Sequence, residues 1–356
     1  MSFLHWKPLI LSCLLMSTVI HHCNAVETTF CVDKNTKVVM YEDENKNKYT
    51  FHPIDTLYEQ YTKQTIMPCQ SDVNIILIQN EETQGKLILK AYEGRSSMNE
   101  AFEKAAKEAS FLMMLSNVPN IVNFKGLYYK KNKYYDYYDG GSETTYTAYI
   151  AQEYVDGTSL KDAINKTGMM NEKKIHTYAT QLVSGLLILK EQKILHKDLG
   201  MYNVMVCKKD DKIKIIDFGN SAERPKDSVH FDKKAIRYFC DTMKDYNYLA
   251  PELGNESACE ITKTLGLQYP ITLQADVWSF GYILYGLVTG KKSLSVTLNK
   301  AKTGIKISFT GQKWKSISPG LKKLIKKCLV YDPAKRISIE EVAEDPWILQ
   351  NFFRRT

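Results

Sequence analysis

The sequence predicts an α+β fold of two lobes, in which a β-rich lobe with one main helix precedes a helical lobe. Two apolar runs typical of strands, at residues 73–79 and 86–90, are separated by a polar turn and followed by a helical pattern at 98–116. A third apolar run at 148–155 ends this half, and a long amphipathic helix is expected at 171–192. The length of the chain fits one domain of this kind.

Residues 1–25 have the pattern of a secretory signal peptide. Lys7 is followed by an apolar run at 9–20, and the small residue Ala25 is placed for cleavage. This run is too short to cross a bilayer, which takes roughly twenty helical residues, although an uncleaved signal anchor is the alternative. No later segment is long and apolar enough to be a transmembrane segment. We therefore expect a secreted protein or one of the secretory pathway.

The remaining chain divides into an extension and the two lobes. Residues 26–68 precede the patterns of the β-rich lobe, and we expect this extension to pack on that lobe. A polar turn is expected at 43–48 and a helix at 54–65, although the apolar residues there are irregularly spaced. The N-terminal lobe is then predicted at 69–155 and the C-terminal lobe at 156–356.

The formal net charge is +8, and the basic residues are spread along the chain. A solvated surface explains a modest excess of this kind, so we expect no nucleic-acid partner. Attraction to anionic lipids is the alternative, which leaves peripheral membrane association open. The oligomeric state does not follow from the sequence.

Of eight cysteines, two lie in the expected signal peptide. Cys207 and Cys328 lie among apolar residues and are expected to be buried thiols. An oxidising compartment would permit disulfides among the others. By proximity in sequence, the expected pairs are Cys31 with Cys69 and Cys240 with Cys259.

Three polar side chains in the second half have the spacing that phosphoryl transfer requires. Asp198 lies five residues before Asn203, and fourteen residues later Asp217 ends an apolar run. One carboxylate has to accept the proton of an attacking hydroxyl, while an amide oxygen and a second carboxylate hold the magnesium ion that neutralises nucleotide phosphates. The pattern therefore predicts Asp198 as the catalytic base and Asn203 and Asp217 as metal ligands.

Two motifs carry a resemblance to eukaryotic protein kinases. They are His-Lys-Asp-Leu-x-x-x-Asn at 196–203 and Asp-Phe-Gly at 217–219, in the order and spacing of the catalytic and metal loops of that family. Ala-Pro-Glu at 250–252 extends the match. The resemblance implies the bilobal protein-kinase fold, ATP and Mg²⁺ as cofactors with Mn²⁺ as a substitute ion, and protein substrates.

The same resemblance assigns two catalytic residues in the N-terminal lobe. Lys90 ends its run as the phosphate-binding lysine of kinases does, and Glu108 corresponds to the helix glutamate that pairs with it. A lysine at a solvated strand end is the alternative for Lys90. Glu100 and Glu103 compete with Glu108, but their offset from the turn at 117–122 differs from the kinase pattern.

Adenine would bind where the run 148–155 ends, if the kinase pattern holds. The resemblance places Ile88 above the ring, Met205 below it, and Gln152 beside it as the gatekeeper. Backbone groups of Glu153 and Val155 would form hydrogen bonds with the ring.

Three long-range arrangements are implied as well. Glu252 is expected to pair with Arg336, and Asp276 to hold the backbone of the catalytic loop. An apolar column that joins the lobes is expected from Leu112, Phe124, His196 and Phe218.

One part of the kinase pattern is absent. Kinases cover the phosphates with a Gly-x-Gly-x-x-Gly hairpin upstream of the lysine, whereas the window at 68–75 contains no glycine. Backbone amides approach phosphate closely only where side chains do not intervene. In this respect the chain resembles the With-No-Gly-loop group of rhoptry-type secretory kinases in coccidian parasites, which contains active enzymes and a pseudokinase. That resemblance implies a parasite secretory organelle or the parasitophorous vacuole as the location.

Two positions depart from the usual serine/threonine kinase pattern, which has a lysine at position 200 and a threonine at position 245. Here they are Gly200 and Asp245, although Tyr248 still favours a serine/threonine arrangement. Lys197 replaces the usual arginine and keeps a cation for a phosphate in the activation segment. Candidates for that phosphate include Ser221, Ser228 and Thr242.

Three functions are compatible with these observations. An active secreted kinase for serine and threonine in proteins is favoured, because all five chemical groups that transfer needs are present. A secreted pseudokinase scaffold is the alternative, since the glycine hairpin and the lysine at position 200 are missing. A kinase-fold enzyme acting on a small molecule is the third, and the intact Ala-Pro-Glu segment argues against it.

Overall fold

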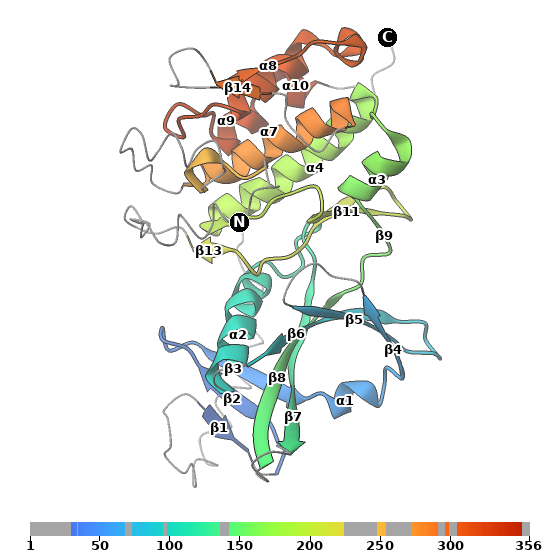
Figure 1. The fold of residues 1–356 in the computed structure, drawn as a ribbon, viewed down its shortest axis with the longest axis vertical. Coiled ribbons are helices and arrows are strands. Elements are labelled where there is room, and N and C mark those ends of the chain that lie inside the picture. The colour runs from blue at the N-terminus through green and yellow to red at the C-terminus, as the bar shows by residue number, and fades with distance from the viewer. Residues whose placement is uncertain are drawn as a thin grey trace, which may run out of the picture.

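Backbone pairing of eight strands builds the N-terminal lobe of the computed structural model, and helices build the C-terminal lobe (Figure 1). The sequence-based prediction of an α+β fold of two lobes is thereby confirmed. The structure describes residues 30–33, 35–67, 73–94, 98–135, 142–223, 248–253, 272–290, 296–298 and 305–350.

The eight strands form one continuous sheet in the order β1-β2-β3-β7-β8-β6-β5-β4. Neighbours are antiparallel except β3 and β7, which run parallel and pair His52 with Tyr128. The strands are β1 (Phe30–Val32), β2 (Val39–Glu42), β3 (Lys48–Pro53), β4 (Lys63–Met67), β5 (Asn74–Gln79), β6 (Lys86–Glu93), β7 (Phe124–Tyr135) and β8 (Ser142–Glu153).

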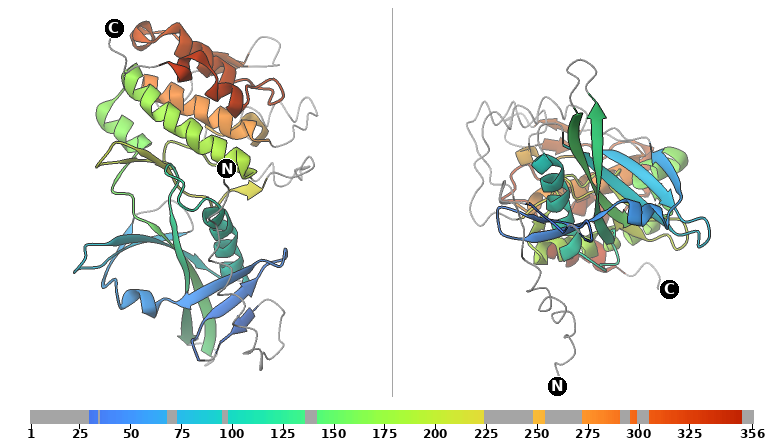
Figure 2. Two further views of the ribbon diagram at one scale, coloured as in Figure 1. Left: turned by 180° about the vertical axis from the view of Figure 1, so that it is seen from behind. Right: turned by 90° about the horizontal axis from the view of Figure 1, so that it is seen from below.

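The extension contributes β1 to β3 at one edge of the sheet and β4 at the other. Strands β1 to β3 lie beside helix α2 (Met98–Met114), as the views from behind and below show (Figure 2). The expected polar turn joins β2 and β3, and the Asp43 carboxylate accepts hydrogen bonds from the backbone amides of Asn45 and Asn47. Phe51 of β3 is fully buried and meets Phe102 of α2 edge to face, with ring centroids 4.6 Å apart.

The helix expected at 54–65 is wrong over most of its length. Only α1 (Asp55–Tyr58) is helical, and Lys63–Met67 is strand β4, paired with β5 so that Ile66 lies opposite Ile76. The apolar residues of this stretch lack the 3.6-residue period of a helix, so pairing with a neighbouring strand decides its structure. The lobe boundary placed at residue 68 stays a prediction.

The C-terminal lobe is built around two long helices, α4 (Glu172–Glu191) and α7 (Gln274–Thr289), which lie side by side in Figure 1. The side chain of Asn171 caps α4 by accepting a hydrogen bond from the amide of Lys174, at the start that the sequence predicts. Helix α7 is buried on every face from Ala275 to Thr289, because the rest of the lobe surrounds it.

Shorter elements complete this lobe. They are β9 (Gly157–Ser159), α3 (Leu160–Thr167), β10 (Ile194–Leu195), β11 (Val204–Cys207), β12 (Ile213–Ile215), β13 (Ala222–Glu223), η1 (Pro251–Leu253), β14 (Val296–Leu298), β15 (Ile305–Ile307), η2 (Gln312–Ser316), α8 (Pro319–Cys328), α9 (Ile339–Ala343) and α10 (Pro346–Leu349).

Cys207 is a half-buried free thiol and Cys328 a fully buried one. Both expected disulfides involve side chains outside the described residues, so the pairing stays a prediction. Among the helices that the structure describes, none is both long enough and apolar enough to cross a membrane.

We expect Phe51→Ala to lower the free energy of unfolding by about 3–5 kcal/mol, because it empties a fully buried ring site between the extension and α2. Urea denaturation followed by circular dichroism measures the change. Met40→Ala on the neighbouring strand is the control, since Met40 is 42% exposed and its loss should cost about 0.5 kcal/mol or less. Equal losses in both variants would contradict the packing role of Phe51.

Candidate active site

A buried lysine connects the two lobes. Lys90 lies on β6 in the interior of the sheet, and only 7% of it is exposed. Its Nζ donates to Glu108 Oε1 of α2 at 2.7 Å and to Asp217 Oδ1 at 2.6 Å. Asp217 follows β12 of the C-terminal lobe, so this pair of contacts joins sheet, helix and second lobe at one nitrogen.

The charges at this junction stabilise one another. Burial alone would lower the pKa of the Lys90 ammonium, but Glu108 and Asp217 outweigh burial and raise it above its usual range. At Asp217, burial would raise the pKa of the carboxyl, and the charge of Lys90 outweighs it and lowers the pKa. Lysine and aspartate are therefore both ionised at neutral pH.

Glu108 receives hydrogen bonds from three side chains of the sheet. Besides Lys90, the Tyr92 hydroxyl donates to its Oε2 and the Gln152 amide to its Oε1, the latter at 3.2 Å. Glu108 is 1% exposed, so these donors replace the water that a carboxylate otherwise requires. The competing Glu100 instead pairs with Lys104 on the surface of α2.

Asp198 is held by donors on both carboxylate oxygens. Its Oδ2 accepts from the side-chain amides of Asn203 and Asn220, each at 3.2 Å, and its Oδ1 accepts from the Tyr248 hydroxyl at 2.6 Å. The Asn203 amide also donates to the backbone oxygen of Asp198 at 2.8 Å. The loop from Asp198 to Asn203 is therefore closed by its own side chains.

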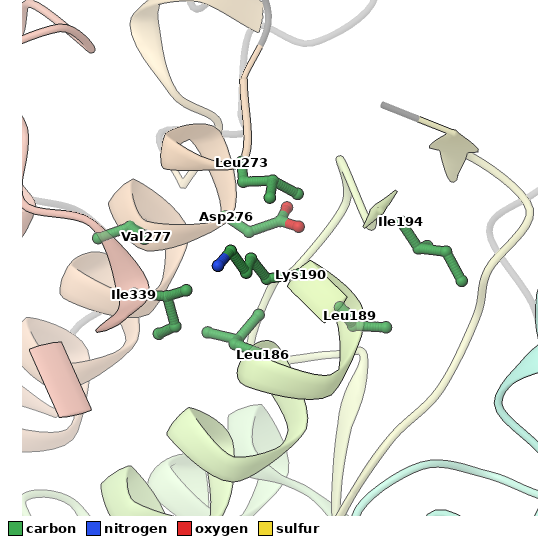
Figure 3. A pocket seen from close by; sticks show the side chains of 8 residues that line it. All are labelled: Leu186, Leu189, Lys190, Ile194, Leu273, Asp276, Val277 and Ile339. Carbon is green, nitrogen blue, oxygen red and sulfur yellow. The ribbon is translucent and has the colours of Figure 1, made fainter. Parts of the chain in front are cut away.

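The carboxylate of Asp276 fixes the start of this loop, as expected. It accepts hydrogen bonds from the amides of His196 at 2.8 Å and Lys197 at 3.0 Å. Burial raises the pKa of this carboxyl more than the neighbouring His196 and the two amides lower it. Figure 3 shows Asp276 at the edge of a small hollow between α4 and α7, which is lined mainly by aliphatic side chains such as Leu186 and Ile339.

The expected pairing of Glu252 with Arg336 is confirmed. The guanidinium donates to both carboxylate oxygens, at 2.6 and 2.9 Å, and both side chains are fully buried. Arg336 also donates to the backbone oxygen of Gln274 at 2.6 Å, at the start of α7. This fork therefore attaches the segment around Glu252 to the core of the C-terminal lobe.

Side chains of the expected apolar column lie in the core. Leu112, His196 and Phe218 are fully buried, Phe124 is half-buried, and the rings of His196 and Phe218 have centroids 4.9 Å apart. The column therefore includes residues of both lobes.

The donor chemistry suits a magnesium ion. Asn203 turns its amide nitrogen toward Asp198, which directs the amide oxygen away from that loop. The backbone oxygen of Asn203 accepts from the amide of Ile216 at 2.9 Å, so Asn203 lies beside the segment that carries Asp217. An amide oxygen and a carboxylate are the hard oxygen ligands that Mg²⁺ prefers.

Residues expected around adenine lie on neighbouring strands. Ile88 is opposite Gln152 across the pair β6 and β8, and it faces the same side as Lys90 two residues on. Met205 lies on β11 and is half-buried, with its neighbours Val204 and Val206 buried on the other face.

At the end of β8, the Glu153 carboxylate pairs with Lys214 at 2.8 Å, and Val155 is buried. The contacts of Glu153 and Val155 with adenine stay predictions. The glycine-free window coincides with the connection of β4 to β5, where Met67 pairs with Ile75, although residues 68–72 lie outside the described part.

Sequence reasoning missed three polar contacts at this site. They are the donors Tyr92, Asn220 and Tyr248, whose partners lie far away in sequence. Gly200 is a sequence signal for the Tyr248 contact alone, because a Cβ atom there would lie 3.2 Å from the Tyr248 ring. As a phosphorylation candidate Ser221 is wrong, because it is fully buried and its hydroxyl donates to the His196 backbone oxygen. The other candidates, Ser228 and Thr242, and also Asp245, lie outside the described residues.

The family model of the protein kinase domain matches residues 72–348. The chain belongs to the protein kinase family. Protein kinase kin1 of Schizosaccharomyces pombe is 34% identical to this kinase over 209 residues, which are 57% of this chain and 20% of the relative. Serine/threonine-protein kinase ppk25 of the same organism is 31% identical over 210 residues, or 58% and 44%.

Calcium-dependent protein kinase 33 of Arabidopsis thaliana is 29% identical to this kinase over 252 residues, which are 69% of this chain and 42% of the relative. The match thus covers less than half the length of each of these three relatives. The likeness therefore concerns the kinase domain.

We expect Arg336→Met to lower the free energy of unfolding of this kinase by about 3–5 kcal/mol, because it leaves the buried Glu252 carboxylate without its partner. Urea denaturation monitored by tryptophan fluorescence measures the loss. Lys335→Met is the control: Lys335 is 79% exposed and pairs with Asp332, so its loss should cost about 1 kcal/mol at most. A loss for Arg336→Met no larger than the control's would contradict a structural role of the pair.

Proposed function

We propose that this protein is an active kinase that transfers the γ-phosphate of ATP to serine and threonine hydroxyls of protein substrates. The observation that carries the proposal is the junction at Lys90, whose ammonium contacts both Glu108 and Asp217. Three of the four side chains that nucleotide binding and metal binding need thus lie in one network, and a backbone hydrogen bond from Ile216, beside Asp217, joins it to the backbone of the fourth, Asn203. In a protein that had lost this activity, random mutation would be expected to have replaced at least one of these four residues.

Each residue then has a distinct role. Lys90, held by Glu108, would bind the α- and β-phosphates, and Asn203 and Asp217 would hold Mg²⁺ or Mn²⁺. The ion, when bound, neutralises charge that develops on the phosphate oxygens. Asp198 would receive the proton of the substrate hydroxyl while the oxygen of that hydroxyl forms its bond to the γ-phosphorus and the bond to the β-phosphate oxygen breaks.

Selectivity for serine and threonine is supported by one relative's printed name, serine/threonine-protein kinase ppk25. The residue Tyr248 before Leu-Ala-Pro-Glu agrees with it.

A secreted pseudokinase scaffold is the second candidate function. The glycine-free window at 68–75 and the missing lysine at position 200 favour it. The closed Asp198 loop and the ion pairs of Lys90 oppose it, because a scaffold does not require a carboxylate that three hydrogen-bond donors hold in one orientation.

The deciding experiment compares the wild-type chain with Asp198→Asn in phosphate transfer from labelled ATP to a general protein substrate with Mg²⁺. Loss of the base should lower the rate about 10²- to 10⁴-fold. Nucleotide binding, measured as thermal stabilisation by ATP and Mg²⁺, should be retained because Lys90 and Asp217 are unchanged. Asp156→Asn, on an exposed residue after β8, should transfer phosphate at the wild-type rate. Equal transfer by wild type and Asp198→Asn would refute the proposal that the protein is an enzyme. A wild-type chain that binds nucleotide but transfers no phosphate would support the scaffold.

Secretion is a second part of the proposal, supported by the pattern of residues 1–25. The resemblance to With-No-Gly-loop kinases supports delivery to a parasite secretory organelle or the parasitophorous vacuole. Expressed in a secreting eukaryotic cell, the full chain should reach the medium with Val26 as its first residue, which mass spectrometry of the N-terminal peptide would detect. A chain lacking residues 1–25 is the control and should stay in the cell. Recovery of Met1 on the secreted chain would rule out cleavage.

A further inference from the structure

A tyrosine hydroxyl lies on the predicted catalytic base. Tyr248, which directly precedes Leu249, donates a hydrogen bond from its hydroxyl to Asp198 Oδ1 at 2.6 Å. Fifty residues of sequence separate the partners, and Tyr248 is only 5% exposed. The short distance and the charge on the acceptor make this the stronger kind of hydrogen bond.

The tyrosine is fixed by the core of the C-terminal lobe. Its ring packs between Tyr202 and Tyr282, with centroid distances of 6.2 and 6.0 Å. Its backbone oxygen accepts a hydrogen bond from the Ser279 hydroxyl of the buried helix α7 at 3.0 Å. The core of the C-terminal lobe therefore holds the hydroxyl in a fixed position beside Asp198.

Gly200 provides the space for this ring. A Cβ atom at position 200 would lie 3.2 Å from Cε2 and Cζ of Tyr248 and 3.2 Å from Cδ2 of Tyr202, which is closer than ordinary carbon contacts. A long side chain at this position would have to displace the ring. The tyrosine thus fills the place beside Asp198 that a side chain at position 200 would otherwise take.

The three hydrogen-bond donors are distributed unevenly over the two oxygens of the Asp198 carboxylate. Oδ2 accepts from two amides, Asn203 and Asn220, whereas Oδ1 accepts from Tyr248. A carboxylate has about four acceptor positions, so one on Oδ1 is left for a substrate hydroxyl. We propose that Tyr248 is a positioning residue, which holds the Asp198 carboxylate in the orientation that presents this position to the substrate.

This inference rests on the proposed role of Asp198 as the base. A different reading of the same contact is that the Tyr248 hydroxyl blocks Oδ1 against substrate. The packing of the ring favours positioning, because a blocking group would have to leave during each turnover and Tyr248 is anchored through α7. If the hydroxyl positions Asp198, its removal should lower kcat, and if it blocks Asp198, its removal should raise kcat.

The test is Tyr248→Phe, which keeps the ring and removes only the donor. We expect kcat for transfer to a protein substrate to fall about tenfold to a hundredfold, as loss of a hydrogen bond to a charged group implies. The KM values for ATP and for the protein substrate should stay within about twofold, because the carboxylate acts in transfer rather than in binding. Tyr282→Phe is the matched control, since it removes a hydroxyl from the adjoining ring, and its kcat should stay within about twofold of wild type.

Melting temperatures of both variants separate misfolding from lost positioning. The inference is supported if Tyr248→Phe melts like Tyr282→Phe and loses kcat alone. It is overturned by an unchanged kcat, by a raised kcat, which indicates blocking, or by a loss that Tyr282→Phe shares. An inactive wild-type chain would instead overturn the proposed function, and with it the role of Asp198.

Discussion

A buried negative charge, the carboxylate of Glu108, is the constraint on which the arrangement of the two lobes depends. Leaving such a charge unpaired costs several kcal/mol, so α2 is stable in its place only while the sheet supplies donors to it. The sheet does so from two strands, through Lys90 and Tyr92 of β6 and Gln152 of β8. Because Lys90 also contacts Asp217, the position of the helix and the geometry of the metal loop are set by one network.

The N-terminal extension also supports this helix. Phe51 of β3 packs on Phe102, six residues before Glu108 in α2. Apolar packing at Phe102 and ion pairing at Glu108 therefore act on the same helix. In a chain whose window at 68–75 offers no glycine for close phosphate contact, this double support adds to the pairing of Lys90 with Ile75, the last residue of that window.

The motif residues were predictable from sequence because their chemistry fixes both type and spacing. Lys90 contacts Glu108 and Asp217, and Asn203 contacts Asp198, as their order in the chain indicates. A backbone hydrogen bond from Ile216 to Asn203 joins the two groups. The helix expected at 54–65 was wrong, because strand pairing across the sheet outweighs local pattern. The positions of Tyr92 and Tyr248 could not be predicted, since a hydroxyl becomes a donor only where the fold brings a distant carboxylate to it.

The strand order has a consequence for where this protein can be shortened. The kinase family model begins at residue 72, after β4, and the sheet order is β1-β2-β3-β7-β8-β6-β5-β4. Cutting the chain at that boundary would remove strands from both ends of the sheet and leave β7-β8-β6-β5. The backbone groups of β5 and β7 would then be open to pairing with other chains, which is a common route to aggregation. The segment defined by family likeness is thus smaller than the segment that builds the whole sheet.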